Sequence, residues 1–307
     1  MAVPDFQSFM LPIMQLTGDK AEHSLGEVIE KLADEFHLTE DERRELLPSG
    51  RQARLDNRVG WAVTYLRKTG LLERTGRGRF RITESGLKVL SQKPSEINMK
   101  FLEQFEGFHE FRKRREASEN DYEESETEVA ENSSQTPDEA IEAAYQRIRA
   151  NLAQELLERV RKVEPKFFET LVVDLLMAMG YGGSRVDAGQ IVGKVGDGGI
   201  DGIINEDKLG LDVVYIQAKR WENRNIGGPE LREFVGALSG RKANKGVYIT
   251  TSTFTDDARA YVRDVPQKIV LIDGQQLAQL MIDYEVGVST AQKYEVKKID
   301  LDYFEGI

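Results

Sequence analysis

The sequence contains no cysteine, and its only histidines are His23, His37 and His109, which all lie in the first third of its 307 residues. Without cysteine there are no disulfides, no thiolate nucleophiles and no zinc sites with a cysteine ligand. Because no histidine follows residue 109, an active site farther along the chain has to work without imidazole. This excludes a Ser-His-Asp triad and a histidine metal cluster from the last two thirds of the protein.

Long apolar segments are also missing. No stretch approaches the roughly 18 consecutive apolar residues of a membrane-spanning helix, and the N-terminal MAVPDFQSFM lacks the basic start of a signal peptide. We therefore expect a cytoplasmic protein that has no membrane partner. The length favours two domains, at least one of which has a sizeable hydrophobic core.

Charge is distributed unevenly along the chain. There are 42 Lys and Arg against 53 Asp and Glu, for a formal net charge of −11, which argues against a protein that coats polyanions over its whole surface. Residues 51–93 nevertheless hold 11 basic side chains and only three acidic ones, a basic patch that could bind phosphate groups. Residues 119–131 are the opposite, with seven acids and no base.

The acidic run predicts a linker. High charge and few apolar side chains cannot offset the entropy lost on ordering, so we expect a flexible segment over about 112–136. This gives a first domain at 1–95, an acidic linker at 96–136 and a second domain at 137–307. A regulatory interpretation is the alternative, in which the acids mimic DNA and mask the basic patch.

The first domain is predicted to be mainly helical. Three short helices are expected at about 4–16, 24–36 and 39–47, and a fourth is indicated by an apolar stripe at helical spacing. The stripe comprises Leu55, Val59, Ala62, Val63 and Leu66. Gly70 ends this helix, and two strand-like runs follow around a glycine turn in LLERTGRGRFRIT. Thr83 occupies the expected N-cap position of a further helix.

This order of elements resembles a winged helix, in which a recognition helix enters the major groove and a basic hairpin contacts the DNA backbone. The candidate DNA contacts on and just before the helix are Arg51, Arg54, Arg58, Trp61 and Tyr65. Those on the hairpin are Arg74, Arg77, Arg79 and Arg81. For Trp61 and Tyr65 the alternative is a wide edge of the hydrophobic core, and winged helices also bind proteins.

The second domain alternates helices with strands. Pro137 and Pro165 open two helices, and strands are expected around 191–192, 199–205 and 213–219. Three more helices then alternate with the strands GVYITT and KIVLI, at about 229–241, 255–265 and 275–284. This order predicts an α/β domain with a mixed sheet flanked by helices.

One strand carries polar residues that suggest chemistry. Alternation along 213–219 puts Gln217 and Lys219 on one face and leaves the other face wholly apolar and buried. Asp201 opens the preceding strand, so a hairpin-like return would bring its carboxylate beside that pair. A carboxylate, an amide oxygen and a lysine could hold Mg²⁺ and hydrolyse a phosphodiester, with Lys219 orienting water or stabilising charge. The spacing alone is weak, since a surface Asp–Lys pair gives the same pattern.

The glycine-rich segment before Asp201 does not favour a nucleotide cofactor. Residues 189–195 are one residue short of a phosphate loop and end in valine. Residues 196–201 miss the last glycine of the dinucleotide-binding pattern. We therefore expect no nucleotide cofactor.

Longer motifs are far more specific. GDGGIDG followed by VYIQAKRW, with FFETLVVDLLMAMGYGG before them, closely resembles the Mrr family of restriction endonucleases, which belong to the PD-(D/E)xK nuclease superfamily. The resemblance extends over nearly the whole chain. Residues 3–90, with NRVGWA and TESGL, are similar to the Mrr N-terminal winged-helix domain. Residues 165–290, with GVYITTSTFT and YEVGVS, are similar to its catalytic domain.

The resemblance implies a restriction-endonuclease-like fold for the second domain and assigns roles to its residues. Asp201 would be the metal-binding acid, Gln217 would stand at the second motif position and Lys219 would be the motif lysine. Glu169, on the helix before the sheet, matches an acid that superfamily members often bring to the site, with a solvated helix acid as the alternative. Gln217 replaces the usual acid, so Mg²⁺, or Mn²⁺ in its place, should be held more weakly by Asp201, Gln217 and Glu169. Asp197 is expected only to shape the glycine bend.

The implied activity is type IV restriction, the cutting of double-stranded DNA that carries methylated adenine or cytosine. A chain with one site cuts one strand at a time, so we expect a homodimer or a larger homo-oligomer. Two alternatives stay open. One is a structure-specific nuclease of the same superfamily, and the other is a winged-helix DNA-binding regulator whose nuclease-like domain is not catalytic.

Overall fold

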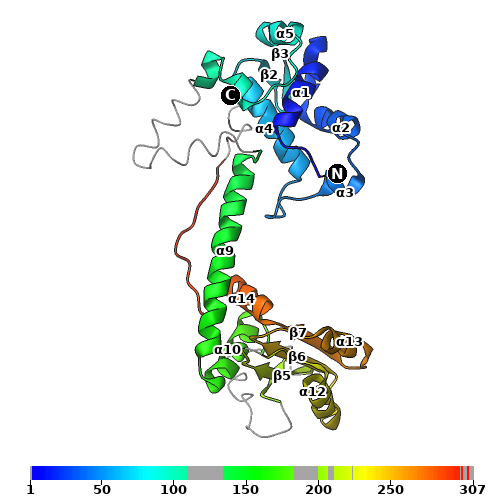
Figure 1. Cartoon of the computed structure of the whole chain (residues 1–307), viewed down its shortest axis with the longest axis vertical. Helices are drawn as coiled ribbons and strands as arrows, with labels where there is room; N and C mark the ends of the chain where they lie inside the picture. The colour runs from blue at the N-terminus through cyan, green and yellow to red at the C-terminus, as the bar shows by residue number, and fades with distance from the viewer. Residues whose placement is uncertain are drawn as a thin grey trace. The chain divides into compact units, whose positions relative to one another are not determined.

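The computed structural model describes residues 2–109, 134–182, 200–206, 211–222, 224–297, 299 and 303. The chain divides into two compact units, Met1–Gln146 with Lys298–Ile307 and Arg147–Lys297, and Figure 1 labels most of their helices and strands. Within the described residues, no helix is both long and apolar enough to cross a bilayer.

The first unit combines short helices with a small sheet. Its helices are η1 (Gln7–Phe9), α1 (Met10–Leu16), η2 (Thr17–Asp19), α2 (Leu25–Glu35), α3 (Glu40–Arg44), α4 (Arg54–Lys68), α5 (Glu84–Ser91) and α6 (Met99–Leu102). Its strands are β1 (His23–Ser24), β2 (Leu72–Gly76) and β3 (Arg79–Ile82), which pair antiparallel in the order β1-β3-β2. Short helices come first, then α4, and then the hairpin of β2 and β3. This is the winged-helix order predicted from the sequence.

Local side-chain chemistry sets several helix ends in this unit. Ser24 and Thr39 each form a capping box with a glutamate three residues on, which starts α2 and α3. Thr83 accepts a hydrogen bond from the Gly86 backbone and caps α5, as predicted. The predicted helix at 39–47 is wrong at its C-terminal end, because the chain becomes extended at Glu45 before Pro48.

The core of the first unit extends past the expected domain boundary. Ile97, Met99, Leu102 and Phe108 are buried together with the apolar stripe of α4. The prediction that a linker begins at residue 96 is therefore wrong for residues 97–108, where apolar side chains recur and fill the core. The acidic run at 119–131 lies outside the described residues.

The second unit is an α/β domain that begins within a long helix. Its elements are α9 (Pro137–Lys162), α10 (Pro165–Ala178), β4 (Gly202–Asn205), β5 (Val213–Lys219), α12 (Gly228–Gly240), β6 (Lys245–Thr250), α13 (Asp256–Asp264), β7 (Lys268–Ile272) and α14 (Gly274–Asp283). The sheet order is β4-β5-β6-β7, with β4 antiparallel to β5 and the other pairs parallel. This confirms the predicted mixed sheet. The strand expected at 191–192 lies outside the described residues.

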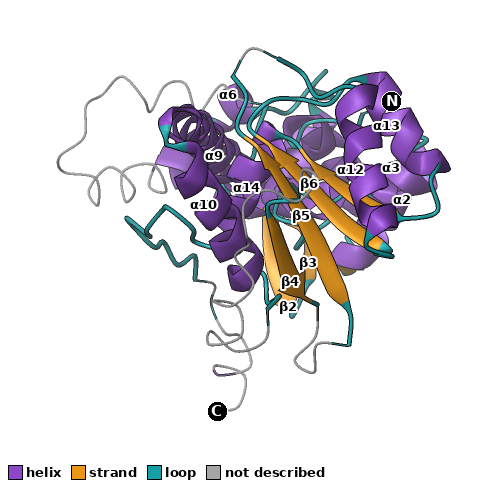
Figure 2. Cartoon of the chain, turned by 90° about the horizontal axis from the view of Figure 1, so that it is seen from below, coloured by secondary structure: helices purple, strands orange, loops and turns teal. Residues whose placement is uncertain are grey.

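Helices cover both faces of this sheet. Figure 2 shows α10 and α14 on one side and α12 and α13 on the other. The apolar face of β5, with Val214, Ile216 and Ala218, packs in the core that includes α10 and α14. The opposite face meets a second core that contains Tyr248 and apolar residues of α12 and α13. Strands covered on both faces bury even their polar residues, and Gln217 on β5 is 2% exposed.

Candidate active site

Asp201 lies directly before β4, opposite the C-terminal part of β5. The antiparallel register pairs Gly202 with Ile216, and the Asp201 backbone N–H donates to the Ile216 carbonyl at 2.9 Å. The predicted hairpin-like return is therefore confirmed. It brings the Asp201 side chain beside the residues that follow Ile216 on β5.

The carboxylate of Asp201 is held by two donors from β5. Its Oδ2 accepts a hydrogen bond from the Ala218 backbone N–H at 2.8 Å and another from Nε2 of Gln217. Both bonds fix the orientation of the carboxylate at the end of the strand. Asp201 and Gln217, which are 16 residues apart in the sequence, thus meet as the motif predicts.

Electrostatics connect this pair with Lys219 and Glu169. Burial raises the pKa of Asp201, whereas the Ala218 N–H, the charge of Lys219 and the Gln217 amide act to lower it. Burial also raises the pKa of Glu169, and the negative charge of Asp201 raises it further, against Lys166 and Lys219. Glu169 therefore lies within electrostatic reach of both Asp201 and Lys219.

The helix α10 presents Glu169 to the sheet because its apolar residues are buried on either side of that acid. Phe168, Leu171 and Val172 are all buried in the core shared with β5. Glu169 itself stays partly exposed. A residue at this position, next to the buried stripe of an amphipathic helix, can direct a charged group to the edge of the site.

Thr250 is a residue of this region that the sequence patterns did not single out. It is fully buried at the end of β6, where it pairs with Lys219 in the parallel register. Its hydroxyl donates to the Lys219 carbonyl at 2.8 Å and accepts from the Ser252 backbone N–H at 3.1 Å. The backbone of Lys219 is thereby fixed from the neighbouring strand. The one available signal was a threonine at the end of an otherwise apolar strand.

The donor set fits a divalent cation. Asp201 and Glu169 are carboxyl groups whose pKa values are raised by burial, and a nearby positive ion would offset both the burial and their repulsion. Among the described residues, no group of three or more His, Cys, Asp or Glu is placed to hold a metal ion. A cation at this site would therefore need the amide oxygen of Gln217, water or substrate oxygens as its other ligands. Asp197 lies outside the described residues.

Tyr65, a predicted DNA contact, lies in the hydrophobic core. It is 6% exposed and belongs to the core of the first unit. Its ring lies 5.5 Å from that of Phe6 and 5.7 Å from that of Trp61, between ring centroids. Aromatic packing covers its face of α4, which favours the core-edge alternative over a DNA contact for Tyr65.

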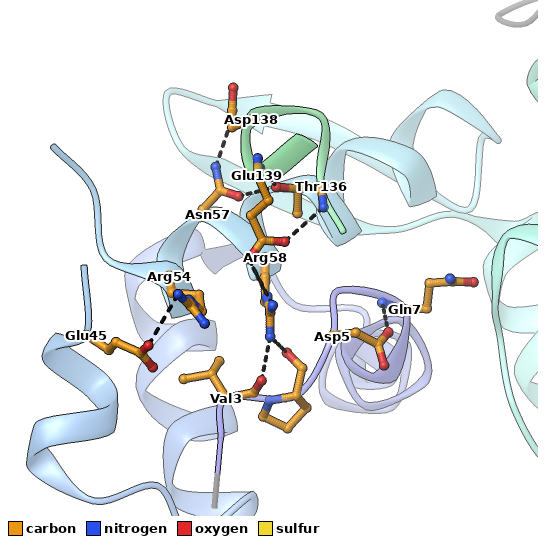
Figure 3. Close-up of polar contacts among 11 residues, drawn as sticks. Val3, Asp5, Gln7, Glu45, Arg54, Asn57, Arg58, Thr136, Asp138 and Glu139 are labelled. Atoms are coloured by element: carbon orange, nitrogen blue, oxygen red, sulfur yellow. Dashed lines mark hydrogen bonds and ion pairs between the residues drawn. The ribbon is translucent and has the colours of Figure 1, made fainter. Parts of the chain in front are cut away.

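Arg58 is also engaged within the protein. Its Nη2 lies 2.8 Å from Oε1 of Glu139, and its Nη1 donates to the backbone carbonyls of Val3 at 2.5 Å and Pro4 at 2.9 Å (Figure 3). The two side chains of the ion pair are only 13% and 8% exposed. Carbonyls and a buried carboxylate occupy its guanidinium, so Arg58 would have to leave these partners in order to bind DNA as predicted.

The first turn of α9 supplies the partners of this face of α4. Trp61 Nε1 donates to Oδ2 of Asp138 at 2.9 Å, and the same oxygen accepts from Asn57 Nδ2 at 2.7 Å. Thr136 caps α9 through a bond from the Glu139 N–H at 3.2 Å and donates to Asn57 Oδ1 at 2.6 Å. Asn57, Arg58 and Trp61 with Thr136, Asp138 and Glu139 are called the α4–α9 joint below. The missed signal is the capping-box spacing of Thr136 and Glu139.

The other predicted DNA contacts lie at the surface. Arg51, Arg74 and Arg77 are exposed. Three arginines form ion pairs: Arg54 with Glu45 at 3.3 Å, Arg79 with Glu22 at 2.8 Å and Arg81 with Glu73 at 2.5 Å. Pairs at the surface contribute little stability, so a phosphate can replace these carboxylates at small cost.

Comparison with known proteins gives matches to both units. A family described as restriction endonuclease matches residues 160–281, and the Mrr N-terminal domain matches residues 6–92. The chain is 39% identical over 309 residues to the type IV methyl-directed restriction enzyme EcoKMrr of Escherichia coli (strain K12), covering 99% of this chain and 100% of that protein.

Two solved structures are also similar. One is the MspJI restriction endonuclease in complex with a 27-mer oligonucleotide, at 25% identity and a TM-score of 0.34 over 43% of this chain and 31% of that chain. The other is the DNA modification-dependent restriction endonuclease AspBHI, at 21% identity and a TM-score of 0.37 over 45% of this chain and 37% of that chain. This chain thus spans about a third of each.

The family matches follow the two units, with the N-terminal match on the winged helix and the endonuclease match on the mixed sheet that carries Asp201, Gln217 and Lys219. Identity at this level over the full length of a relative accounts for both parts of the chain at once. The protein belongs to the Mrr family of restriction endonucleases.

Proposed function

We propose that this enzyme is a Mg²⁺-dependent type IV restriction endonuclease that hydrolyses phosphodiester bonds in methylated double-stranded DNA. The observation that carries the proposal is the Asp201 carboxylate, which Gln217 and the Ala218 N–H hold at the end of β5 within electrostatic reach of Lys219 and Glu169. Methylated DNA as the substrate is suggested by the methyl-directed relative that covers the whole chain.

Asp201, Glu169 and the amide oxygen of Gln217 would hold the metal. When bound, Mg²⁺ supplies a Lewis acid for the phosphate and a more acidic water. Mn²⁺ could replace it at oxygen ligands. Lys219 carries the positive charge that orients the attacking water and stabilises the negative charge that develops on the phosphate oxygens. The hydrogen bonds on Asp201 keep its carboxylate in one orientation before substrate binds.

The winged helix would bind the DNA duplex. The exposed arginines of the hairpin, Arg74, Arg77, Arg79 and Arg81, suit contacts with backbone phosphates, which position a protein without reading sequence. A chain with one site cuts one strand at a time, so cutting of both strands favours a homodimer or a larger assembly.

A plasmid-cleavage assay tests the proposal. Methylated and unmethylated plasmid are incubated with Mg²⁺ and either the unaltered protein or Asp201→Ala. We expect the unaltered protein to cut the methylated plasmid alone and Asp201→Ala to cut neither while it still binds DNA. Cutting of both plasmids would remove the dependence on methylation, and a branched substrate would then test structure-specific cleavage. Normal cutting by Asp201→Ala would show that the site is misplaced.

A further inference from the structure

The surface of α4 divides into three arcs. One arc is the apolar stripe in the core of the first unit. The second arc, with Asn57, Arg58, Trp61 and Tyr65, is covered by the N-terminal segment and by the first turn of α9. The third arc contains Asp56, Gly60, Thr64 and Arg67, which follow one another at spacings of four, four and three residues and therefore share one side of the helix.

The third arc faces solvent. Asp56 and Arg67 are exposed, and Gly60 and Thr64 are partly exposed. The Thr64 hydroxyl donates to the Gly60 carbonyl at 2.8 Å, so its polar group is satisfied within α4. The middle of this arc thus presents only small side chains, which is the surface that allows a helix to approach another molecule closely.

Gly60 is an unusual residue for the middle of a helix. Glycine is among the poorest helix formers, so Gly60 lowers the stability of α4 relative to a residue with a side chain such as alanine. A β-carbon at Gly60 would meet no atom of the other described parts of the protein within 4 Å. Packing within the described structure therefore does not require a glycine at this position. Close approach of a ligand to the helix would require one.

Arg67, in the last turn of α4, provides a second and independent observation. Its guanidinium is exposed and forms no hydrogen bond or ion pair with the described residues. Burial lowers its pKa, and the positive charge of Arg74 on β2 lowers it further. Two guanidinium groups within electrostatic reach of each other repel, and an anion placed on both would remove that repulsion. Guanidinium is the side-chain group best suited to phosphate.

The N-terminal end of the same arc is acidic instead. The pKa of Asp56 is raised by burial and by the charge of Glu30. Two acids in reach of each other repel phosphates, so the part of the arc that suits a nucleic acid runs from Gly60 to Arg67 and continues onto Arg74.

We propose that DNA binds to the third arc of α4, with Gly60 and Thr64 closest to the base edges and Arg67 and Arg74 together on one backbone phosphate. The inference rests on the proposed function and names the DNA-contacting face of the winged helix. It replaces the face with Arg58, Trp61 and Tyr65, on which Arg58 and Trp61 hold the first turn of α9.

Gly60→Ala and Arg67→Gln test this placement. The first should affect stability and DNA binding in opposite directions. Gly60→Ala should raise the melting temperature by about 1–3 °C, since alanine favours helix, yet weaken DNA binding about fivefold or more. Gly26→Ala is the matched control, because Gly26 is an exposed helical glycine of the same unit whose β-carbon would also meet nothing within 4 Å. It should stabilise the protein and leave DNA binding unchanged.

Arg67→Gln should weaken DNA binding about tenfold. The negative slope of log K for DNA binding against log salt concentration should become shallower by about one, the amount expected for the loss of one phosphate contact. The melting temperature should not fall, since Arg67→Gln breaks no ion pair and removes the repulsion between Arg67 and Arg74. Binding is measured by fluorescence anisotropy with a labelled methylated duplex, using the full chain in EDTA so that no cutting occurs.

Unchanged binding by both Gly60→Ala and Arg67→Gln, beside clear binding by the unaltered protein, would overturn the placement and leave the proposed function intact. A loss of stability in Gly60→Ala that accompanies its loss of binding would also overturn it, because the glycine would then be structural. If the unaltered protein binds no duplex at all, the proposed function fails and the inference with it.

Discussion

The side-chain amide of Gln217 donates a hydrogen bond to the carboxylate of Asp201 at a position where Gln217 is only 2% exposed. A second acid in place of this amide would put two carboxylates in contact inside the protein. The neutral amide instead stabilises the charged form of Asp201 before any cation arrives. Because Gln217 is neutral, the residues that would bind the cation carry one negative charge fewer than they would with an acid at this position.

Gln217→Glu should therefore have opposite effects with and without metal. In EDTA we expect a lower melting temperature, with a loss of about 1–3 kcal/mol, because two buried carboxylates repel. With Mg²⁺ the variant should regain more stability than the unaltered protein does, since its site carries one more negative charge. Thermal melts at increasing Mg²⁺ concentrations measure both effects. An equal Mg²⁺ response in the two proteins would argue against Gln217 as a metal ligand.

The raised pKa values of Asp201 and Glu169 predict how metal-free stability depends on pH. Folding raises these pKa values above the unfolded ones, so the folded protein favours the protonated carboxyls. Their contribution to stability is complete below the unfolded pKa values and is lost as pH rises through the folded ones. Asp201→Asn, which stays neutral, should lose less stability than the unaltered protein when pH is raised across this range in EDTA. Identical pH profiles for the two proteins would contradict the burial of this carboxyl.

Mg²⁺ should reverse this dependence, because a cation competes with protons for the same carboxylates. The stabilisation by Mg²⁺ should therefore weaken as pH falls toward the raised pKa values of Asp201 and Glu169, at a higher pH than for ordinary carboxyls. Melting-temperature shifts at a fixed Mg²⁺ concentration, recorded over a pH series, measure the effect. Asp201→Asn is the control and should show a smaller shift at every pH.

Thr250→Val tests the position of Lys219. Valine keeps the shape of threonine but removes the hydroxyl that bonds to the Lys219 carbonyl and the Ser252 N–H. We expect a loss of about 1–3 kcal/mol in stability, because both backbone groups lose a partner. The single-turnover cleavage rate should also fall while DNA affinity is retained, and Thr250→Ser, which keeps the hydroxyl, should restore the rate. Cleavage by Thr250→Val at the unaltered rate would remove the positioning role.

Much of this structure could be predicted from local sequence patterns. Alternation along β5 correctly separated the face with Gln217 from the apolar face, and the position of Asp201 at the start of the preceding strand gave the return that places it beside Gln217. The cap at Thr83 was equally local. Each of these depends on residues that are neighbours in the sequence or along one strand.

The covered arc of α4 could not be predicted in this way. Helical periodicity correctly grouped Arg58, Trp61 and Tyr65 on one side of α4, but it gave no information about what packs there. The partners of Arg58 and Trp61 lie 81 and 77 residues away on α9. Cationic and aromatic side chains suit both DNA and a buried carboxylate, so residue type could not distinguish the two.

The ion pair between Arg58 and Glu139 gives a stability prediction for the α4–α9 joint. Glu139→Gln leaves the guanidinium buried without its counter-charge, and we expect a loss of about 3 kcal/mol in the free energy of unfolding. Glu40→Gln is the control. It breaks the Arg44–Glu40 pair, whose side chains are 81% and 73% exposed, and should cost less than about 0.5 kcal/mol.

Replacing both partners, as in Arg58→Met with Glu139→Met, should recover part of the loss, since no charge is then left buried. The recovery should be incomplete, because the carbonyls of Val3 and Pro4 lose the donors that Arg58 provides. Denaturant unfolding of the unaltered protein, Glu139→Gln, Glu40→Gln and the double variant measures these differences in the free energy of unfolding. Equal stability of Glu139→Gln and the unaltered protein would mean that the joint opens in solution, and the face of α4 with Arg58 and Trp61 would then be free to bind DNA.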